Sequence, residues 1–420
     1  ADRLCRMAAA GDPALGRVLE FCCADPKASV RTRFFAPLEP VSGDPETVPP
    51  SRSYAPSRLL EALWGWLEQG LDPDLPVAAR DIILRTVAEP PAGQLDALRR
   101  RAADRIEAGL REAADDPRAE KRLKAQLDVS DFSQISHVTT LLRLAPVLRG
   151  ALNGLPAVIC DMDEALAAKI RDRYETAAEA DPDAGVWSLF LIMTRFEHPW
   201  RLLRVFERIA RRGDDLLVSQ TDMSHIGEAL LADAAFHLDR FAKPPRTQDD
   251  AVSAAEALTA FSAITVGMTR EIGIRKDGPW GLRLFALRGR ASEHMAAIHD
   301  VVQDVLARAV PEGGGPKARG GARAGEDLQR RAEALCVFMQ LTREDAGRAA
   351  VGGAHASALA AIIDRLETAG QSLLARLRAG GPDTDPIYAR AEQIAALMRA
   401  VGEGETAGLL LRRTAAAHAA

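Results

Sequence analysis

The sequence predicts an all-α protein, built either as an irregular multi-helix bundle or as a solenoid-like array of helices. Apolar residues, mostly leucine and alanine, recur every three or four positions in one segment after another from Arg58 to the C-terminus. This spacing places the apolar side chains on one face of an α-helix. Glycine, proline and aspartate stand at the ends of these segments, where helices are capped or broken. The alternation typical of a β-strand occurs at one place only.

Composition excludes several functional classes. The 420 residues are 47% hydrophobic and 27% charged, which is ordinary for a globular protein. A net charge of −5 and an aromatic content of 5% argue against a nucleic-acid partner, since such surfaces are basic and often rich in stacking side chains. The longest apolar stretches, such as Leu189–Met193, are far shorter than the roughly 20 residues of a membrane-spanning helix. Five cysteines without a CxxC pair indicate reduced thiols in a cytoplasmic protein.

The pattern of helices and breakers divides the chain into four parts. Residues 1–54 are expected to hold an N-terminal helix and a proline-rich extended arm, and residues 55–310 a helical body. Residues 311–325 are rich in glycine, which predicts a flexible linker. Residues 326–420 again show helical periodicity and are expected to form a C-terminal helical module.

Two of these parts contain a more specific expectation. In the first, a helix is expected at about Pro13–Cys23, and the arm that follows is expected to be held by Phe34, Phe35 and Leu38. In the second, apolar residues alternate over 272–284 around an Asp-Gly pair, which is typical of a β-hairpin. A helix–loop–helix joint fits the same residues, and it is the interpretation that we favour.

A pair of carboxylates follows a short apolar run. The segment Leu155–Glu164 ends in Asp161-Met-Asp163-Glu and resembles the first motif of haloacid-dehalogenase-like phosphatases. The resemblance covers about ten residues and implies that one carboxylate attacks phosphorus while the other acts as acid and base. Ala165 stands where that family has threonine. The interpretation that we favour is that Asp161 or Asp163 caps the helix that follows.

Histidines and carboxylates share helix faces farther along the chain. On one predicted helix, His225 lies three residues before Glu228, and His237 lies four residues after an aspartate. His294 lies on another predicted helix. Two such helices packed together would resemble the metal sites of ferritin-like bundles, but the Glu-x-x-His order of those sites is missing. We therefore expect structural histidines, and neither a metal nor another cofactor.

The densest basic cluster combines Arg99-Arg100-Arg101 with Arg105. Acidic residues follow on the same predicted helix, so a solvated helix face of mixed charge is the interpretation that we favour. The alternative is a patch that contacts RNA or anionic lipid.

The functional expectation is a non-enzymatic adaptor or scaffold for protein–protein interaction. The G-x-S-x-G elbow, the phosphate-binding G-x-x-x-x-G-K-[ST] loop and the G-x-G-x-x-G loop are missing from the sequence. A wide apolar stripe on the C-terminal module is expected to exceed what so small a module buries, and so to dock on the helical body, on a second copy or on a protein partner. Its partner-binding candidates are Leu359, Ile363, Leu366, Leu373 and Leu377. The alternative is an enzyme or metal-binding bundle that uses Asp161 and Asp163, or a site around His225 and His237.

Overall fold

A computed structural model of the chain confirms the all-α class. It describes residues 26–85, 92–210, 224–311, 322–349, 351–379 and 384–419. Of these residues, 82% are helical. No β-strand occurs within these ranges, where an isolated bridge between Ile159 and Phe196 is the nearest approach to one.

The chain forms two compact units. The first comprises Ala1–Gly213 with Gln220–Ala229, and the second Asp214–Ser219 with Leu230–Ala420. This division differs from the predicted boundaries, because helices on both sides of the glycine-rich segment pack together in the second unit. The predicted linker lies mostly outside the described residues, and its last four residues belong to a helix that begins at Ala322.

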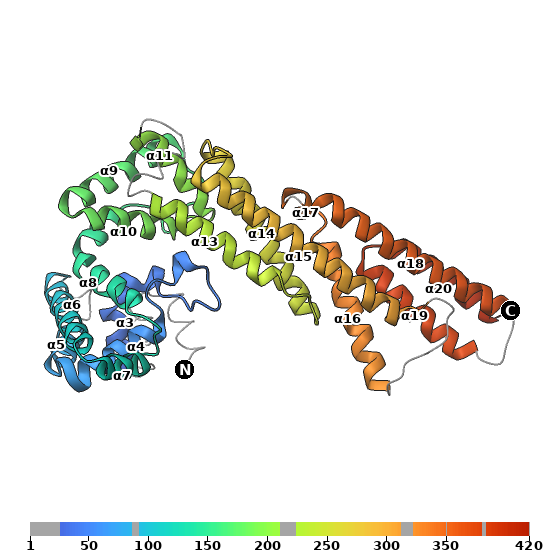
Figure 1. The fold of residues 1–420 in the computed structure, drawn as a ribbon, viewed down its shortest axis with the longest axis horizontal. Coiled ribbons are helices and arrows are strands. Elements are labelled where there is room, and N and C mark those ends of the chain that lie inside the picture. The colour runs from blue at the N-terminus through green and yellow to red at the C-terminus, as the bar shows by residue number, and fades with distance from the viewer. Residues whose placement is uncertain are drawn as a thin grey trace. The chain divides into compact units, whose positions relative to one another are not determined.

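Helices of the first unit pack mainly in sequence order, with α6 against α8, and α8 against α9 and α10 (Figure 1). Its elements are α3 (Pro26–Phe34), η1 (Ala36–Val41), η2 (Pro50–Arg52), α4 (Ser57–Trp66), η3 (Leu67–Leu71), α5 (Asp74–Arg85), α6 (Ala92–Ala114), α7 (Pro117–Leu127), α8 (Ser133–Leu152), α9 (Glu164–Ala180), α10 (Pro182–Met193), η4 (Pro199–Leu202) and α11 (Leu203–Ala210). The next helix, α13 (Ser224–Phe241), has residues in both units.

Aspartate side chains begin three of these helices. Asp116, Asp163 and Asp181 adopt extended backbone conformations, and each accepts a hydrogen bond from a backbone N–H in the first turn of α7, α9 or α10. Such a bond satisfies one of the amides that the helix itself leaves without a partner. Proline follows at the first helical position of α7 and α10, where its missing N–H costs nothing.

The arm expected to be extended is instead folded. Of the predicted segment, α3 and two short 3-10 helices form within 26–52, and the helix expected at Pro13–Cys23 lies outside the described residues. The three predicted anchors, Phe34, Phe35 and Leu38, are all buried. Pro37 and Pro50, which favoured an extended arm, instead stand in the first turns of the two 3-10 helices, because the fixed φ of proline suits the start of a helical turn.

In the second unit the last helices pack against a pair of long ones, with α14 and α15 against α16, and α15 against α18 (Figure 1). Helix α18 also contacts α19 and α20, and these two contact each other. The elements are α14 (Gln248–Glu271), α15 (Pro279–Ala309), α16 (Ala322–Leu341), α17 (Asp345–Arg348), α18 (Gly352–Arg378), α19 (Thr384–Ala400) and α20 (Gly404–Ala419).

A helix–loop–helix joint connects α14 and α15, as we favoured for residues 272–284, and no hairpin forms there. The backbone closes so tightly that a Cβ atom at Gly281 would lie 1.9 Å from the carbonyl oxygen of Arg275. Trp280 beside it is fully buried. Glycine is therefore required at 281 by close approach rather than by an unusual φ angle.

Helix α14 alone among the described helices is long and apolar enough, by length and composition, to cross a membrane. In this structure 61% of its most apolar stretch is buried. The buried core helix of a large helical unit has the same character.

Candidate functional site

The two carboxylates of the phosphatase-like segment have structural contacts. Asp163 is the N-cap of α9, and its Oδ1 accepts a hydrogen bond from the backbone N–H of Leu166 at 2.7 Å. This confirms the capping interpretation. Asp161 instead pairs with Arg201, 2.6 Å between Oδ1 and Nη1. Neither residue follows a strand, since the described part of this segment has only the bridge at Ile159.

The histidine candidates are not brought into one cluster. His225 and Glu228 lie in the part of α13 that belongs to the first unit, whereas His237 belongs to the second unit, and His294 lies on α15. Over the described ranges, no three His, Cys, Asp or Glu side chains are placed to hold a metal ion. His237 packs edge-on against Phe236, with ring centroids 5.3 Å apart, and burial lowers its pKa.

The partner-binding candidates on α18 belong to the core of the second unit. Leu359, Leu366, Leu373 and Leu377 are buried, and Ile363 is half-buried. Helix α18 packs against α15, α19 and α20, which cover this stripe. The sequence left open whether the helical body, a second copy or a protein partner covers this stripe. Side chains that are covered in this way cannot be the surface to which a partner binds.

The basic cluster on α6 is largely neutralised. Arg99 is 4% exposed, so it does not lie on a solvated face. It donates to Asp96 at 2.8 Å and to the carbonyl oxygen of Phe34 at 2.8 Å, and desolvation lowers its pKa. Arg101 binds both carboxylate oxygens of the buried Asp72 at 2.6 Å. Paired arginines of this kind are poor ligands for phosphate, because their charges are already met by carboxylates.

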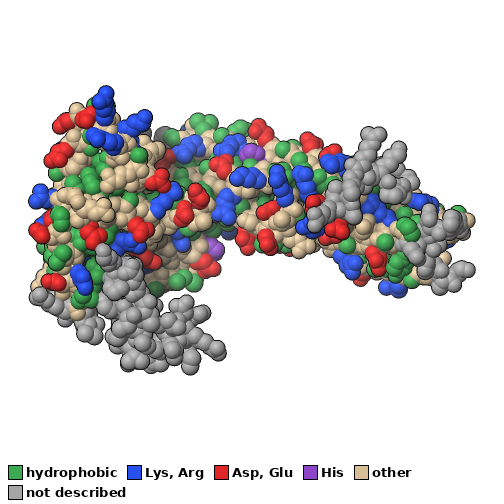
Figure 2. All heavy atoms as spheres, turned by 90° about the horizontal axis from the view of Figure 1, so that it is seen from below, with side chains coloured by type: hydrophobic (Ala, Val, Ile, Leu, Met, Phe, Trp, Pro, Cys, Tyr) green, Lys and Arg blue, Asp and Glu red, His purple; other side chains and the backbone are tan. Residues whose placement is uncertain are grey.

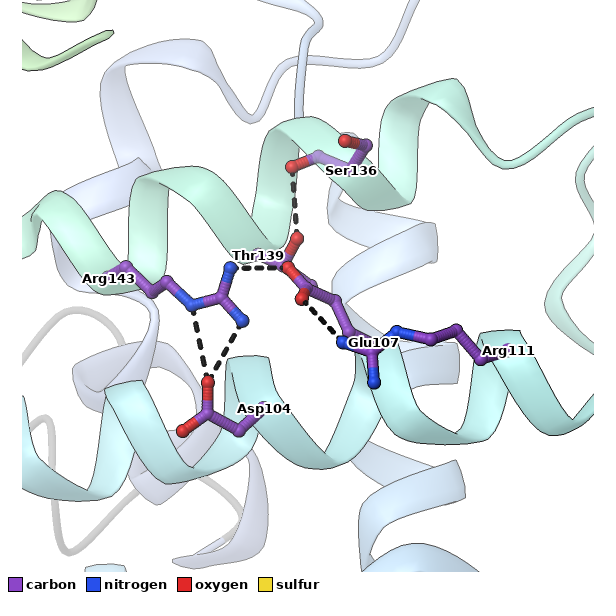
Figure 3. Close-up of polar contacts among 6 residues, drawn as sticks. All are labelled: Asp104, Glu107, Arg111, Ser136, Thr139 and Arg143. Carbon is purple, nitrogen blue, oxygen red and sulfur yellow. Dashed lines mark hydrogen bonds and ion pairs between the residues drawn. The ribbon is translucent and has the colours of Figure 1, made fainter. Parts of the chain in front are cut away.

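A second group of charges joins α6 to α8 at the surface (Figure 3). Arg143 of α8 donates to Glu107 at 2.5 Å and to Asp104 at 2.9 Å, both on α6. The hydrogen bond to Glu107 raises the pKa of Arg143, and the same bond lowers the pKa of Glu107. Across the face drawn in Figure 2, cations and anions lie interspersed. The ion pairs of Arg143 help to hold α6 against α8.

A different surface stands out on α15. Leu282, Phe285, Ala286 and Gly289 are all exposed, and Phe285 is 79% exposed. Their spacing of i, i+3, i+4 and i+7 puts them on one side of the helix. We call these four residues the Phe285 stripe. Isolated exposed hydrophobics are normal, so the alignment of the four distinguishes this surface from the others.

The core face of the same helix lies opposite the Phe285 stripe. Leu284, Leu287 and Ala291 are buried, and successive residues turn by about 100° around a helix, so these three point away from the stripe. A Cβ atom added at Gly289 would meet no atom within 4 Å. Helix α15 is therefore apolar on two faces, of which the fold covers one.

Basic residues outnumber acidic ones in the segment that contains the Phe285 stripe. The segment from Arg270 to Arg290 contains six Lys and Arg residues and two acidic ones, whereas the whole chain has a net charge of −5. Within the segment, Arg275 pairs with Asp277 at 2.9 Å, and Arg290 pairs with Asp239 at 2.5 Å. The local charge is thus opposite in sign to that of the protein as a whole.

The sequence contained the signal for this surface, and it was missed. A helix with one buried face should show one apolar stripe, but from residue 281 to 291 apolar residues occupy two opposite sides. The comparisons with known proteins add no other guide: no family model, no curated protein and no solved structure matches the chain.

Proposed function

We propose that this protein is a non-enzymatic helical adaptor that binds an acidic, amphipathic segment of a partner protein on the Phe285 stripe. The observation that carries the proposal is the exposed spacing of i, i+3, i+4 and i+7 on α15. Complexes that pair an amphipathic helix with an apolar surface use anchors at these spacings. Aromatic side chains, including Phe, are also enriched in protein interfaces.

Energetics support a stripe of this size as a binding surface of moderate strength. Full burial of a Leu or Phe side chain contributes about 1.5–3 kcal/mol. Leu282 is 59% exposed and Phe285 79% exposed, so burial by a partner would still release most of this free energy for each side chain. Ala286 and Gly289, at the C-terminal end of the stripe, have small side chains or none, which lets a partner backbone approach closely.

Charge selects the kind of partner. Arg270 and Lys276, in the segment that leads into α15, are exposed, and an acidic segment would be attracted to them before contact. A basic segment would be repelled. The partner that this charge favours is an acidic helix. Self-association of this net-negative chain and attachment to an anionic membrane are the alternatives that the test distinguishes.

Other features agree with an adaptor in the cytoplasm. Asp161 and Asp163 are engaged in an ion pair and a helix cap, which are structural roles. Cys160 and Cys336 are free thiols, and free thiols are usual in the reducing cytoplasm.

A displayed library of random helical peptides provides the test. Peptides are selected on the full chain and counter-selected on the double variant Leu282→Ser, Phe285→Ser. We expect enriched peptides to be acidic, to show apolar residues at helical spacing, and to lose affinity as salt rises. The matched control is Val252→Ser on α14, which also removes an exposed aliphatic side chain from the second unit and should leave binding unchanged.

The same experiment can refute the proposal. Enrichment of basic or uncharged peptides, equal binding to the double variant, or no enrichment at all would each contradict it. Vesicles that contain anionic lipid, and sedimentation of the protein alone, form two further arms. If wild type but not the double variant bound vesicles or formed dimers, while no peptide was enriched, the stripe would serve a membrane or a second copy.

A further inference from the structure

The second unit contains a cavity between α15, α18 and α19 that is separate from the Phe285 stripe. Its volume is about 360 Å³, which lies within the range of roughly 300–1,000 Å³ typical of small-molecule sites. Val310, Leu373 and Ile394 line it and are each 2% exposed or less. The charged side chains that line it are Arg390, Arg365 and Asp364. A lining that combines apolar side chains with polar groups is usual for a ligand site.

Arg390 is the unusual member of this lining. It is half-buried, and its guanidinium donates to the Gln393 side-chain oxygen at 2.7 Å and to the carbonyl oxygen of Ala309. Both acceptors are neutral, and no carboxylate of the described residues forms an ion pair with it. Two bonds leave three of the five N–H donors of a guanidinium for another acceptor.

These neutral neighbours leave the charge of Arg390 without a compensating anion. Burial lowers its pKa, and no nearby carboxylate acts in the opposite direction. Arg99 shows the contrast within the same protein, because a buried arginine there has Asp96 beside it. A cation that is partly removed from water and meets only neutral acceptors gains from binding an anion.

We propose that this cavity binds a small organic monocarboxylate, whose carboxylate pairs with Arg390 and whose aliphatic body rests on Val310, Leu373 and Ile394. Guanidinium and carboxylate are matched in geometry and bind through two parallel hydrogen bonds. The charged side chains of the lining are Arg390, Arg365 and Asp364, so it carries one net positive charge. This charge matches a monocarboxylate better than a phosphate ester, which at pH 7 brings nearly two negative charges to the site. The buried apolar side chains of Val310, Leu373 and Ile394 suit a hydrocarbon chain of a few carbon atoms.

Calorimetric titration of the full-length protein with three matched probes tests this inference. Hexanoate has the proposed chemistry, hexanamide has the same shape without the charge, and hexyl phosphate has more charge. We expect one hexanoate to bind per chain, hexanamide to bind at least about tenfold more weakly, and hexyl phosphate to bind more weakly than hexanoate. If hexanamide or hexyl phosphate bound as tightly as hexanoate, or if hexanoate did not bind at millimolar concentration, the proposal would fail.

Variants of Arg390 identify the group responsible. Arg390→Gln should weaken hexanoate binding by about tenfold or more, since the paired charge is lost. Arg390→Lys keeps the charge without the bidentate geometry and should give an intermediate affinity. The control is Arg399→Gln on the same helix, an exposed arginine that bonds to its own helix at the carbonyl oxygen of Ala395. It should bind hexanoate like wild type. Equal affinities of wild type and Arg390→Gln, or a lysine variant no better than the glutamine variant, would assign the binding to something other than this charge.

Discussion

His299 on α15 and His355 on α18 meet edge to face inside the second unit, with ring centroids 5.9 Å apart and ring planes at 72°. The Nε2 atom of His355 lies 2.9 Å from the hydroxyl of Thr342. Burial is the main cause that lowers the pKa of His355, to about 4, and His299 and Arg343 lower it further. Burial also lowers the pKa of His299. The packing of α15 against α18 therefore requires that both rings be neutral.

This pair predicts loss of stability in acid. The folded-state pKa of His355 lies below the ordinary value of 6.5, so the unfolded chain binds a proton more readily than the folded one. Stability from the neutral ring is complete above pH 6.5 and is lost as the pH falls from 6.5 towards 4. The loss for His355 alone is about 3 kcal/mol, at 1.36 kcal/mol for each pKa unit.

Urea unfolding at pH 7.5 and pH 4.5 measures the effect. Wild type should lose more free energy of unfolding between these pH values than His355→Gln, which has no titrating ring at this position. Other buried histidines, such as His137 and His237, also have lowered pKa values, so the difference between the two proteins is the relevant quantity. Equal losses would contradict the assignment.

Much of the fold could be predicted from the sequence, because helical periodicity depends on local spacing. The joint at 272–284 and the cap at Asp163 followed from residues close together in the chain. The extended arm predicted within residues 1–54 was wrong, since Pro37 and Pro50 stand in the first turns of 3-10 helices whose burial depends on contacts made elsewhere in the fold. The division into two units depends on which helices pack together, and periodicity contains no information about that.

The candidate surfaces were much less predictable. The α18 stripe around Leu366 looks the same in sequence whether other helices or a partner cover it, and here α15, α19 and α20 do so. The cavity near Arg390 joins α15 to α18 and α19, which come much later in the chain, so no local motif marks it. The Phe285 stripe alone could be found from local spacing, provided that both faces of one helix are examined.

Two glycines of α15 should respond oppositely to alanine. At Gly281 the new Cβ would lie 1.9 Å from a backbone oxygen of Arg275, which cannot move aside as a flexible side chain can. We expect Gly281→Ala to lower the free energy of unfolding by about 2–3 kcal/mol or more. Gly289→Ala is the matched control in the same helix, and it should raise that free energy by about 0.5–1 kcal/mol, because alanine favours an exposed helical position. Both values come from denaturant titration, and equal effects of the two substitutions would contradict the tight joint.

The two cysteines within the described residues should differ in reactivity. Cys336 is fully buried, and burial raises the pKa of its thiol to about 12, whereas Cys160 is exposed. The thiolate is the reactive form. In a protein with the remaining cysteines replaced by serine, Ellman's reagent at neutral pH should modify Cys160 roughly a hundredfold faster or more than Cys336. Cys336 should react at the rate of unfolding once denaturant is added. Rapid modification of Cys336 in the native protein would show that α16 is more open than this structure has it.

The last prediction contrasts two aspartates of α6 that both pair with arginine. Asp96 is 4% exposed and receives hydrogen bonds from Arg99 at 2.8 Å and from Arg149 at 2.6 Å. Removal of its carboxylate in Asp96→Ala leaves Arg99 buried without an anion, which should cost about 3–5 kcal/mol of unfolding free energy. Asp104 pairs with Arg143, but its side chain is 67% exposed, and Asp104→Ala should cost less than about 1 kcal/mol.

The double variant Asp96→Leu, Arg99→Met distinguishes the cost of an unpaired guanidinium from the loss of the attraction between the two charges. With both charges of the pair replaced by apolar side chains, we expect most of the loss seen in Asp96→Ala to be recovered, because what destabilises that variant is the unpaired guanidinium rather than the lost attraction. Arg149, which is partly exposed, keeps access to water in either variant. Thermal and urea unfolding of the three variants and wild type would measure the recovery. If the double variant were as unstable as Asp96→Ala, the hydrogen bonds from Arg99 to the carbonyl oxygens of Phe34 and Arg33 would be what holds α3 against α6.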